Sequence, residues 1–118
     1  PYESRDEFDL LTQAIRSAYR KFSTGIYVLW YPVKAGLPLD AFYAAMTSAE
    51  IPKILRIEHH IRDKRISEGL SGSGLLVINP PWHLKDEMTL CLEFLDEHLS
   101  VVPGNTTRCD WLVPEKSI

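Results

Sequence analysis

The residues best suited to chemistry are Asn79-Pro80-Pro81-Trp82, which directly follow an apolar run that ends at Ile78. Paired prolines stiffen the chain and leave backbone carbonyls free of strand pairing. An amide and a free carbonyl at fixed spacing can hold an exocyclic amine, and the neighbouring indole can stack on a base. The same four residues also fit a rigid turn before a helix, because short motifs of this kind arise often by chance. Both interpretations stay open.

A second candidate is the opening tripeptide Pro1-Tyr2-Glu3, which precedes the capping box formed by Ser4 and Glu7. In a nucleotide-handling α/β sheet, the loop between a strand end and the next helix is the usual place for catalytic residues. The chain begins at Pro1 without an initiator Met, so we expect a processed product, a shortened chain or a piece of a longer protein.

Basic residues gather in the middle of the chain, around the adjacent His59 and His60. They could grip RNA phosphates, or they could form a charged strand edge that resists pairing with other strands. Adjacent strand residues point to opposite faces, so we expect the two histidines not to share a metal ion. The basic residues are Lys53, Arg56, Arg62, Lys64 and Arg65.

Composition narrows the possible functions. The 118 residues suit one domain, and 45% hydrophobic residues argue against disorder. With a net charge of −3 the chain has no overall excess of basic residues, so its charge gives no argument for a nucleic-acid-binding protein. No apolar run approaches the roughly 20 residues of a membrane helix. No secretory leader is visible, and we expect Cys91 and Cys109 to be reduced thiols. These features favour a cytoplasmic protein without a membrane partner.

Helical and strand-like patterns alternate along the chain and must position these candidates. Strands separated by helices indicate right-handed crossovers and a parallel sheet, whereas two strands without a helix between them could pair antiparallel. The unbroken apolar run Ile26–Tyr31 predicts a strand covered on both faces and ended by Pro32, and Cys91 falls on the apolar side of its helix. The expected elements are a helix after the Ser4–Glu7 capping box, a strand Ile26–Tyr31, a helix around Leu39–Met46, a strand Lys53–Ile61, a strand Leu75–Ile78, a helix His83–Leu99 and a strand Arg108–Val113.

Several of these segments together resemble a known family. Pro1-Tyr2-Glu3, Lys53–Glu58 and above all Gly72–Trp82 look like the C-terminal part of bacterial 23S ribosomal RNA adenine-N6 methyltransferases, a family also described as involved in catabolism of external DNA. Trp111–Glu115 is similar to the family's C-terminal ending. The resemblance spans essentially the whole chain.

The resemblance implies the C-terminal half of a class I, Rossmann-like α/β methyltransferase sheet whose last strand is antiparallel. Residues 1–118 would form a partial catalytic domain, with Ile26–Tyr31, Lys53–Ile61 and Leu75–Ile78 as its fifth, sixth and seventh strands. The family's catalytic motif is Asp-Pro-Pro-Tyr, so Pro1 and Tyr2 would be its last two residues. Its Asp and the glycine-rich cofactor loop would lie upstream of this chain.

The implied function of the intact protein is S-adenosylmethionine-dependent N6-methylation of an adenine in 23S ribosomal RNA, without a metal. Tyr2 would stack on the flipped base beside Pro1, and we expect this chain alone to be inactive. The expected substrate contacts are Asn79, Trp82, Arg62, Lys64 and Arg65. Two alternatives are a non-catalytic α/β module that binds nucleic acid or a partner through its basic strand edge, and a structural half-domain without function.

Overall fold

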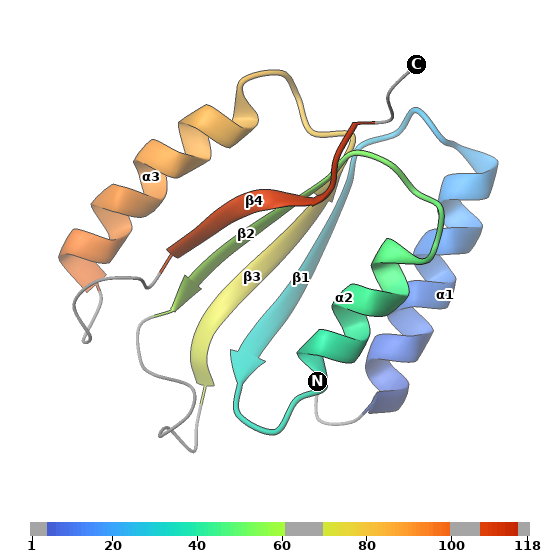
Figure 1. The fold of residues 1–118 in the computed structure, drawn as a ribbon, viewed down its shortest axis with the longest axis horizontal. Helices are drawn as coiled ribbons and strands as arrows, with labels where there is room; N and C mark the ends of the chain where they lie inside the picture. Colours follow the sequence, from blue (N-terminus) through green and yellow to red (C-terminus); the bar gives the residue numbers. More distant parts are fainter. Residues whose placement is uncertain (1–4, 61–69, 100–106, 116–118) are drawn as a thin grey trace.

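The computed structural model describes residues 5–60, 70–99 and 107–115 (Figure 1). This part contains three helices and four strands, which alternate broadly as the sequence predicts. Ser4 of the expected capping box lies outside the described residues. The elements are α1 (Arg5–Lys21), β1 (Tyr27–Lys34), α2 (Leu39–Thr47), β2 (Ile54–His60), β3 (Leu70–Ile78), α3 (Leu84–Leu99) and β4 (Thr107–Val113).

The four strands form one sheet in the order β1-β3-β2-β4. β3 is antiparallel to both β1 and β2, and β4 is antiparallel to β2. The predicted parallel sheet is therefore wrong for neighbouring strands, while the antiparallel pairing of β2 with β3 is confirmed. β1 and β2 do run in the same direction, but the crossover through α2 leaves room for one strand between them, and β3 occupies it.

Two strand boundaries differ from the prediction by more than one residue. β1 continues through Pro32 to Lys34, because in the described part it pairs only with β3, and an edge strand tolerates a residue without an N–H. β3 begins at Leu70 rather than Leu75, so Gly72 and Gly74 lie within a strand and not in a loop. A Cβ atom on Gly72 would overlap the backbone of His59, which shows that close approach explains this glycine.

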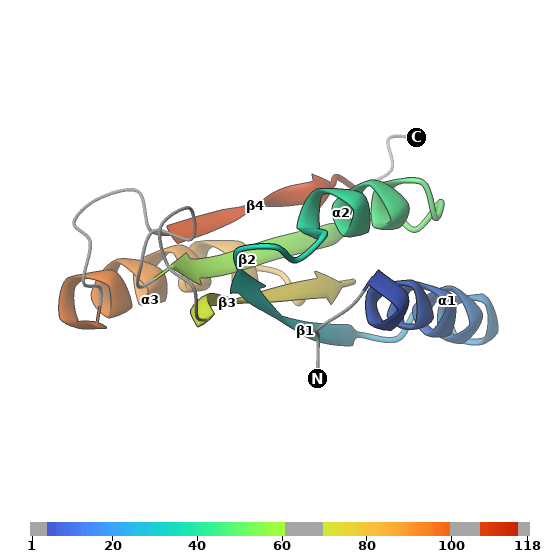
Figure 2. The same cartoon turned by 90° about the horizontal axis from the view of Figure 1, so that it is seen from below.

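Helices cover both faces of the sheet (Figure 2): α1 and α2 lie on one face and α3 on the other. The larger core lies beneath α1 and α2, and the smaller one beneath α3. The larger core comprises Phe8, Ile15, Leu29, Tyr31, Val33, Leu39, Phe42, Met46, Ile51, Ile54, Leu76 and Ile78; the smaller comprises Leu55, Ile57, Val77 and Leu92. No helix of the described ranges has both the length and the hydropathy of a membrane span.

The coverage of β1 differs from the prediction. Leu29 is buried, but Val28 is 61% exposed and Trp30 is 48% exposed, so the expectation of a strand covered on both faces is wrong for this chain. The reason is that α3 packs mainly against β2 and β4 and leaves that face of β1 uncovered. Cys91 on α3 is also exposed and not buried as predicted.

Candidate functional site

The strand register defines two opposite ends of the sheet, near which the expected site residues must be placed. β1 and β2 end at Lys34 and His60, at one end of the sheet, whereas Ile78 at the end of β3 pairs with the first residues of β1 and β2 at the other. The Tyr27 hydroxyl donates to the carbonyl of Ala18 at 3.0 Å, so α1 ends beside the start of β1. α1 therefore begins at the end of the sheet where β1 and β2 finish (Figure 1).

Asn79 holds together two loops at the opposite end. Its Nδ2 donates to the carbonyl oxygens of Ser23 at 2.8 Å and Gly25 at 2.9 Å, and its backbone N–H donates to Lys53 at 3.1 Å. Its φ of 56° lies in the left-handed region, which asparagine tolerates better than most residues. Both amide protons thus connect the end of β3 to the α1–β1 loop, which is a structural task.

Trp82 lies on the surface of the same end, with 87% of its area exposed. Its ring stacks on that of His83, with centroids 4.1 Å apart. Together with Lys53, Lys85 and Trp111 it lines a cavity of about 260 Å³, whose wall also includes Pro80, Pro81, Asp86 and Glu115. Two cations face two carboxylates there, so the cavity offers aromatic surface without an excess of positive charge.

The structure does not bring Asn79 and Trp82 close to the beginning of α1. The nine residues of β3 separate the two ends of the sheet by roughly 30 Å, at about 3.4 Å per residue. Pro1, Tyr2, Arg62, Lys64 and Arg65 lie outside the described residues. The loop after β3 and the beginning of α1 are thus at opposite ends of the described sheet.

The predicted basic strand edge is not an edge. β2 lies between β3 and β4, so its backbone is paired on both sides. Arg56 is bound by Asp110 of β4 through two hydrogen bonds, Nε to Oδ1 at 2.9 Å and Nη2 to Oδ2 at 2.7 Å. This pair connects β2 to β4, and the hydrogen bonds that Arg56 donates to Asp110 raise the pKa of Arg56.

His59 and His60 lie on opposite faces of the sheet, as predicted. The His59 ring is 3.9 Å from the carboxylate of Asp96 on α3, and the His60 ring contacts Glu58 on the face beneath α1 and α2. Within the described ranges, no group of three or more histidine, cysteine and carboxylate side chains is arranged to hold a metal ion.

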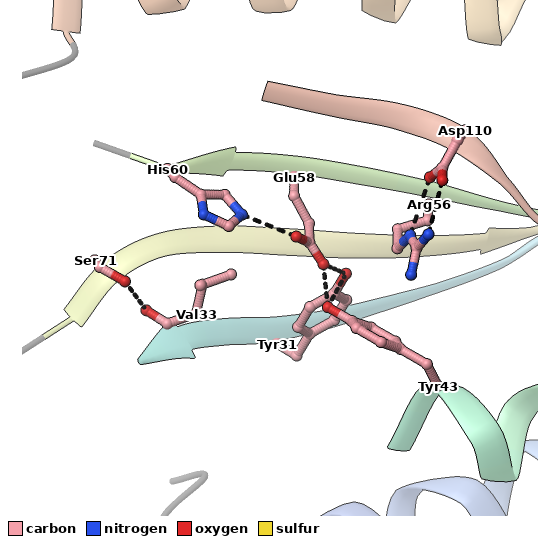
Figure 3. A network of polar contacts seen from close by, with 8 residues as sticks. All are labelled: Tyr31, Val33, Tyr43, Arg56, Glu58, His60, Ser71 and Asp110. Atoms are coloured by element: carbon pink, nitrogen blue, oxygen red, sulfur yellow. Dashed lines mark hydrogen bonds and ion pairs between the residues drawn. The ribbon is translucent and has the colours of Figure 1, made fainter. Parts of the chain in front are cut away.

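A buried polar network that sequence reasoning missed lies on the latter face (Figure 3). Glu58 is 2% exposed. Its Oε2 accepts hydrogen bonds from the hydroxyls of Tyr31, at 2.6 Å, and Tyr43, and its Oε1 lies 2.9 Å from Nε2 of His60. Charge-assisted hydrogen bonds of this kind compensate for removing a carboxylate from water.

These contacts control the ionisation of the network. Burial alone raises the pKa of Glu58, but the hydrogen bonds from His60, Tyr31 and Tyr43 outweigh it and lower that pKa to about 2. Burial and the neighbouring carboxylate raise the pKa of both tyrosines above the ordinary value. Glu58 is therefore ionised and both hydroxyls are protonated at neutral pH.

Gly74 makes this network possible. It is the register partner of both Tyr31 on β1 and Glu58 on β2, so it lies between them. A Cβ atom on Gly74 would overlap the Tyr31 ring, which crosses β3 at this point to reach the carboxylate. The Gly72-Ser73-Gly74 motif was the available sequence signal, since isolated glycines in strands often mark close approach.

The network also supports the beginning of α1. The Phe42 ring lies 5.6 Å from that of Tyr31 and 5.0 Å from that of Phe8, which is in the first turns of α1. Tilted and edge-on aromatic contacts of this kind are rigid and strongly apolar. The first turns of α1 are thus packed against the same aromatic cluster that surrounds the network.

Known proteins resemble the chain over almost its whole length. The sequence model of the family described as "Ribosomal RNA large subunit methyltransferase D, RlmJ" matches residues 1–113. Two proteins named "Ribosomal RNA large subunit methyltransferase J", from Haemophilus influenzae and Escherichia coli, are each 36% identical to this chain. The match covers 98% of this chain and 41% of the length of each of these proteins. A crystal structure of a Legionella pneumophila protein superposes with a TM-score of 0.81 at 37% identity, over 93% of this chain and 40% of that one.

Proposed function

The chain belongs to the family of ribosomal RNA large subunit methyltransferases described as RlmJ, and from this we propose that it is the C-terminal part of an enzyme that methylates N6 of an adenine in 23S ribosomal RNA. The observation that carries the proposal is the family match over residues 1–113, together with 36% identity to two proteins named "Ribosomal RNA large subunit methyltransferase J". The chain spans 41% of the length of those relatives, so the activity is proposed for the whole protein.

The strand arrangement supports a class I, Rossmann-like sheet. β1 and β2 run in the same direction with β3 antiparallel between them, an arrangement that agrees with the antiparallel last strand implied by the sequence resemblance. We propose that β1, β2 and β3 are the fifth, sixth and seventh strands of that sheet. Residues 1–118 then form a partial catalytic domain.

The proposed methyl donor is S-adenosylmethionine, but the described residues do not fit its binding site. A donor-binding glycine loop follows a strand and opens a helix, where backbone N–H groups point at the ligand. Gly72 and Gly74 are instead within β3 and paired on both sides. We therefore assign donor binding to the part of the protein that the relatives have and this chain does not match.

The residues of this chain act on the RNA. We propose that Tyr2 stacks on the flipped adenine and that Pro1 helps to hold its amine, at the end of the sheet where α1 begins. Arg62, Lys64 and Arg65 contact phosphates and set the register of the RNA. For Asn79 the geometry favours the rigid turn, because both amide protons are bound by backbone carbonyls.

Trp82 keeps the role of a substrate contact, but to a part of the RNA distant from the target base. Its exposed ring at the opposite end of β3 is accessible for stacking on an unpaired base. It is therefore expected to affect binding of RNA and not the methyl transfer itself.

A fusion tests the function directly. The portion of the Haemophilus influenzae protein that precedes the matched region is joined to this chain, and 23S ribosomal RNA is assayed for N6-methyladenosine by mass spectrometry with labelled donor. We expect methylation at one adenine. Tyr2→Ala should lower kcat/KM by about 5- to 150-fold, the value of about 1–3 kcal/mol of base stacking, while Tyr2→Phe retains most of it. A folded fusion that binds the donor and leaves 23S RNA unmodified would refute the proposal.

A further inference from the structure

The cavity of about 260 Å³ at the end of β3 has walls from separate parts of the chain, and hydrogen bonds hold these parts together. The Asn79 N–H donates to the carbonyl of Lys53 at 3.1 Å, and the Lys53 N–H donates to the carbonyl of Pro114 at 3.1 Å. The Cys109 thiol of β4 donates to the carbonyl of Lys85, in the first turn of α3, at 3.6 Å. The loop after β3, the residue before β2 and the end of β4 are thus fixed relative to one another, so the cavity is preformed.

The backbone adopts an uncommon conformation at two residues of the cavity wall. Lys53 has a φ of 61° and His83 has a φ of 75°, both in the left-handed region that residues with a side chain rarely adopt. In the described ranges, Asn79 and Glu50 are the other non-glycine residues with a positive φ. Conformations of this kind gather at binding and active sites, where the surrounding structure holds them in place.

Two tryptophans provide the apolar surface of the cavity. Trp82 is 87% exposed and Trp111 is 37% exposed. The His83 ring covers one face of the Trp82 indole, with 28° between the ring planes, and the other face remains for a ligand. The volume lies just below the roughly 300–1,000 Å³ of pockets for drug-sized molecules, so it suits a single planar ring system.

The charged side chains of the cavity do not neutralise one another. Within the ranges that the structure describes, none of these four side chains has an ion-pair or hydrogen-bond partner. They are therefore available to a ligand that offers both a negative group and hydrogen-bond donors. A nucleotide offers both, because its phosphate suits a lysine and its base donors suit a carboxylate. The four are Lys53, Lys85, Asp86 and Glu115.

A carboxylate in such a cavity distinguishes guanine from the other bases. Guanine has two adjacent donors on its Watson–Crick edge, N1–H and the N2 amine, which match the two oxygens of a carboxylate. Adenine and cytosine each offer one amine beside an unprotonated ring nitrogen, and uracil offers one N–H between two carbonyls. These acceptors would face the carboxylate and be repelled by it. Stacking on indole does not distinguish the bases, because every base has a π face.

We propose that this cavity binds one unpaired guanine of the RNA substrate. The base stacks on the free face of Trp82, its Watson–Crick edge donates to Asp86 or Glu115, and its phosphate contacts Lys53 or Lys85. The choice of RNA as the source of the guanine rests on the proposed function. The cavity lies at the end of the sheet opposite the beginning of α1, so the bound guanine is distant from the target adenine and contributes to binding of the RNA.

Fluorescence titration of the 118-residue chain with short RNAs tests the site. The ligands are the pentanucleotides UUGUU, UUAUU, UUCUU and UUUUU, with GMP as a free nucleotide. UUGUU should bind about 5- to 150-fold more tightly than each of the other three, the range expected for one bidentate base contact. Equal affinity for the four RNAs, or binding of none of them, would overturn the proposal. GMP that binds as tightly as UUGUU would make a free nucleotide the ligand and would overturn it too.

Matched variants test which residues form the site. Trp82→Ala should weaken binding of UUGUU about 5- to 150-fold through lost stacking, and it should fold normally because Trp82 is exposed. Asp86→Asn combined with Glu115→Gln should abolish the preference for guanine. Glu87→Gln removes a charge from the same turn of α3 outside the cavity and should retain the preference. With folding checked by circular dichroism, unchanged binding by Trp82→Ala, or the same loss of preference in Glu87→Gln, would refute the proposal.

Methylation by the fusion with the Haemophilus influenzae portion separates this inference from the proposed function. Trp82→Ala in the fusion should raise KM for 23S RNA several-fold and leave kcat unchanged. A lower kcat at unchanged KM would assign Trp82 to the reaction itself and contradict the inference. Guanine-selective binding by the chain without methylation by the fusion would support this site and contradict the proposed function, and methylation with a KM that does not depend on Trp82 would do the reverse.

Discussion

Glu58→Gln is predicted to lower the free energy of unfolding of this chain in a pH-dependent way. The pKa of Glu58 falls from an ordinary 4.5 to about 2 in the folded protein, and each pKa unit corresponds to about 1.4 kcal/mol. The ionised carboxylate therefore contributes about 3–4 kcal/mol at pH 7, within the range expected for several charge-assisted hydrogen bonds. Glutamine has nearly the same shape but no charge, so the variant loses most of this contribution.

The sign of the pH dependence follows from the lowered pKa. The stabilisation is complete above about pH 4.5 and is lost as the pH falls toward 2, because protons then bind the unfolded chain in preference. Urea unfolding followed by circular dichroism should show the same difference in free energy of unfolding between the two proteins at pH 7 and pH 5, and a shrinking difference at pH 4 and pH 3. At pH 7 the loss of about 2–3 kcal/mol of this contribution should lower the melting temperature by about 8–12 °C, at about 4 °C per kcal/mol.

A surface carboxylate provides the control. Glu93→Gln on the exposed side of α3 should change the free energy of unfolding by no more than about 0.5 kcal/mol at any of these pH values. A difference between the original chain and Glu58→Gln that stayed constant from pH 7 to pH 3 would refute the reasoning, because it would mean that packing and not ionisation stabilises the network.

Three other substitutions test the structure, each by urea unfolding at pH 7. Gly74→Ala should cost about 1–3 kcal/mol, because the new methyl overlaps the Tyr31 ring, and combining it with Tyr31→Leu should recover part of the loss; equal costs in both backgrounds would contradict this. Asp110→Asn should cost less than about 1 kcal/mol, because Asp110 is partly exposed, and the cost should fall in high salt; a salt-independent loss would argue against an ionic origin. Asn79→Ala should cost about 1–3 kcal/mol through its two carbonyl partners, and a neutral result would show that this turn is held by other contacts.

The local elements follow from the sequence because their patterns are local. The apolar spacing from Phe8 onward predicts α1, and the alternation around Leu55 and Arg56 predicts β2 as a strand with two unlike faces. The strand order depends on which strands pair across long stretches of sequence, and a local pattern carries no information about such pairing. The insertion of β3 between β1 and β2 is such a choice.

The polar network illustrates why the candidate site was predicted only in part. Tyr31, Tyr43 and Glu58 are far apart in the chain and meet only through the strand register at Gly74. An apolar run around Tyr31 suggests a core residue, which is correct for its ring, but nothing in that run indicates the partner of its hydroxyl. From its motif, Asn79 is likewise a plausible substrate-binding residue. Only its hydrogen bonds to the carbonyls of Ser23 and Gly25, more than 50 residues away in the chain, show that it has a structural task.

The central position of β3 has a consequence for synthesis of the protein on the ribosome. Tyr27 pairs with Ile78, about 50 residues further along the chain, so β1 and β2 leave the ribosome before their shared neighbour β3 does. Until β3 emerges, neither β1 nor β2 has a strand partner from the described sheet. Such long-range pairing is slow to form, and this interval is when the nascent polypeptide is most dependent on chaperones.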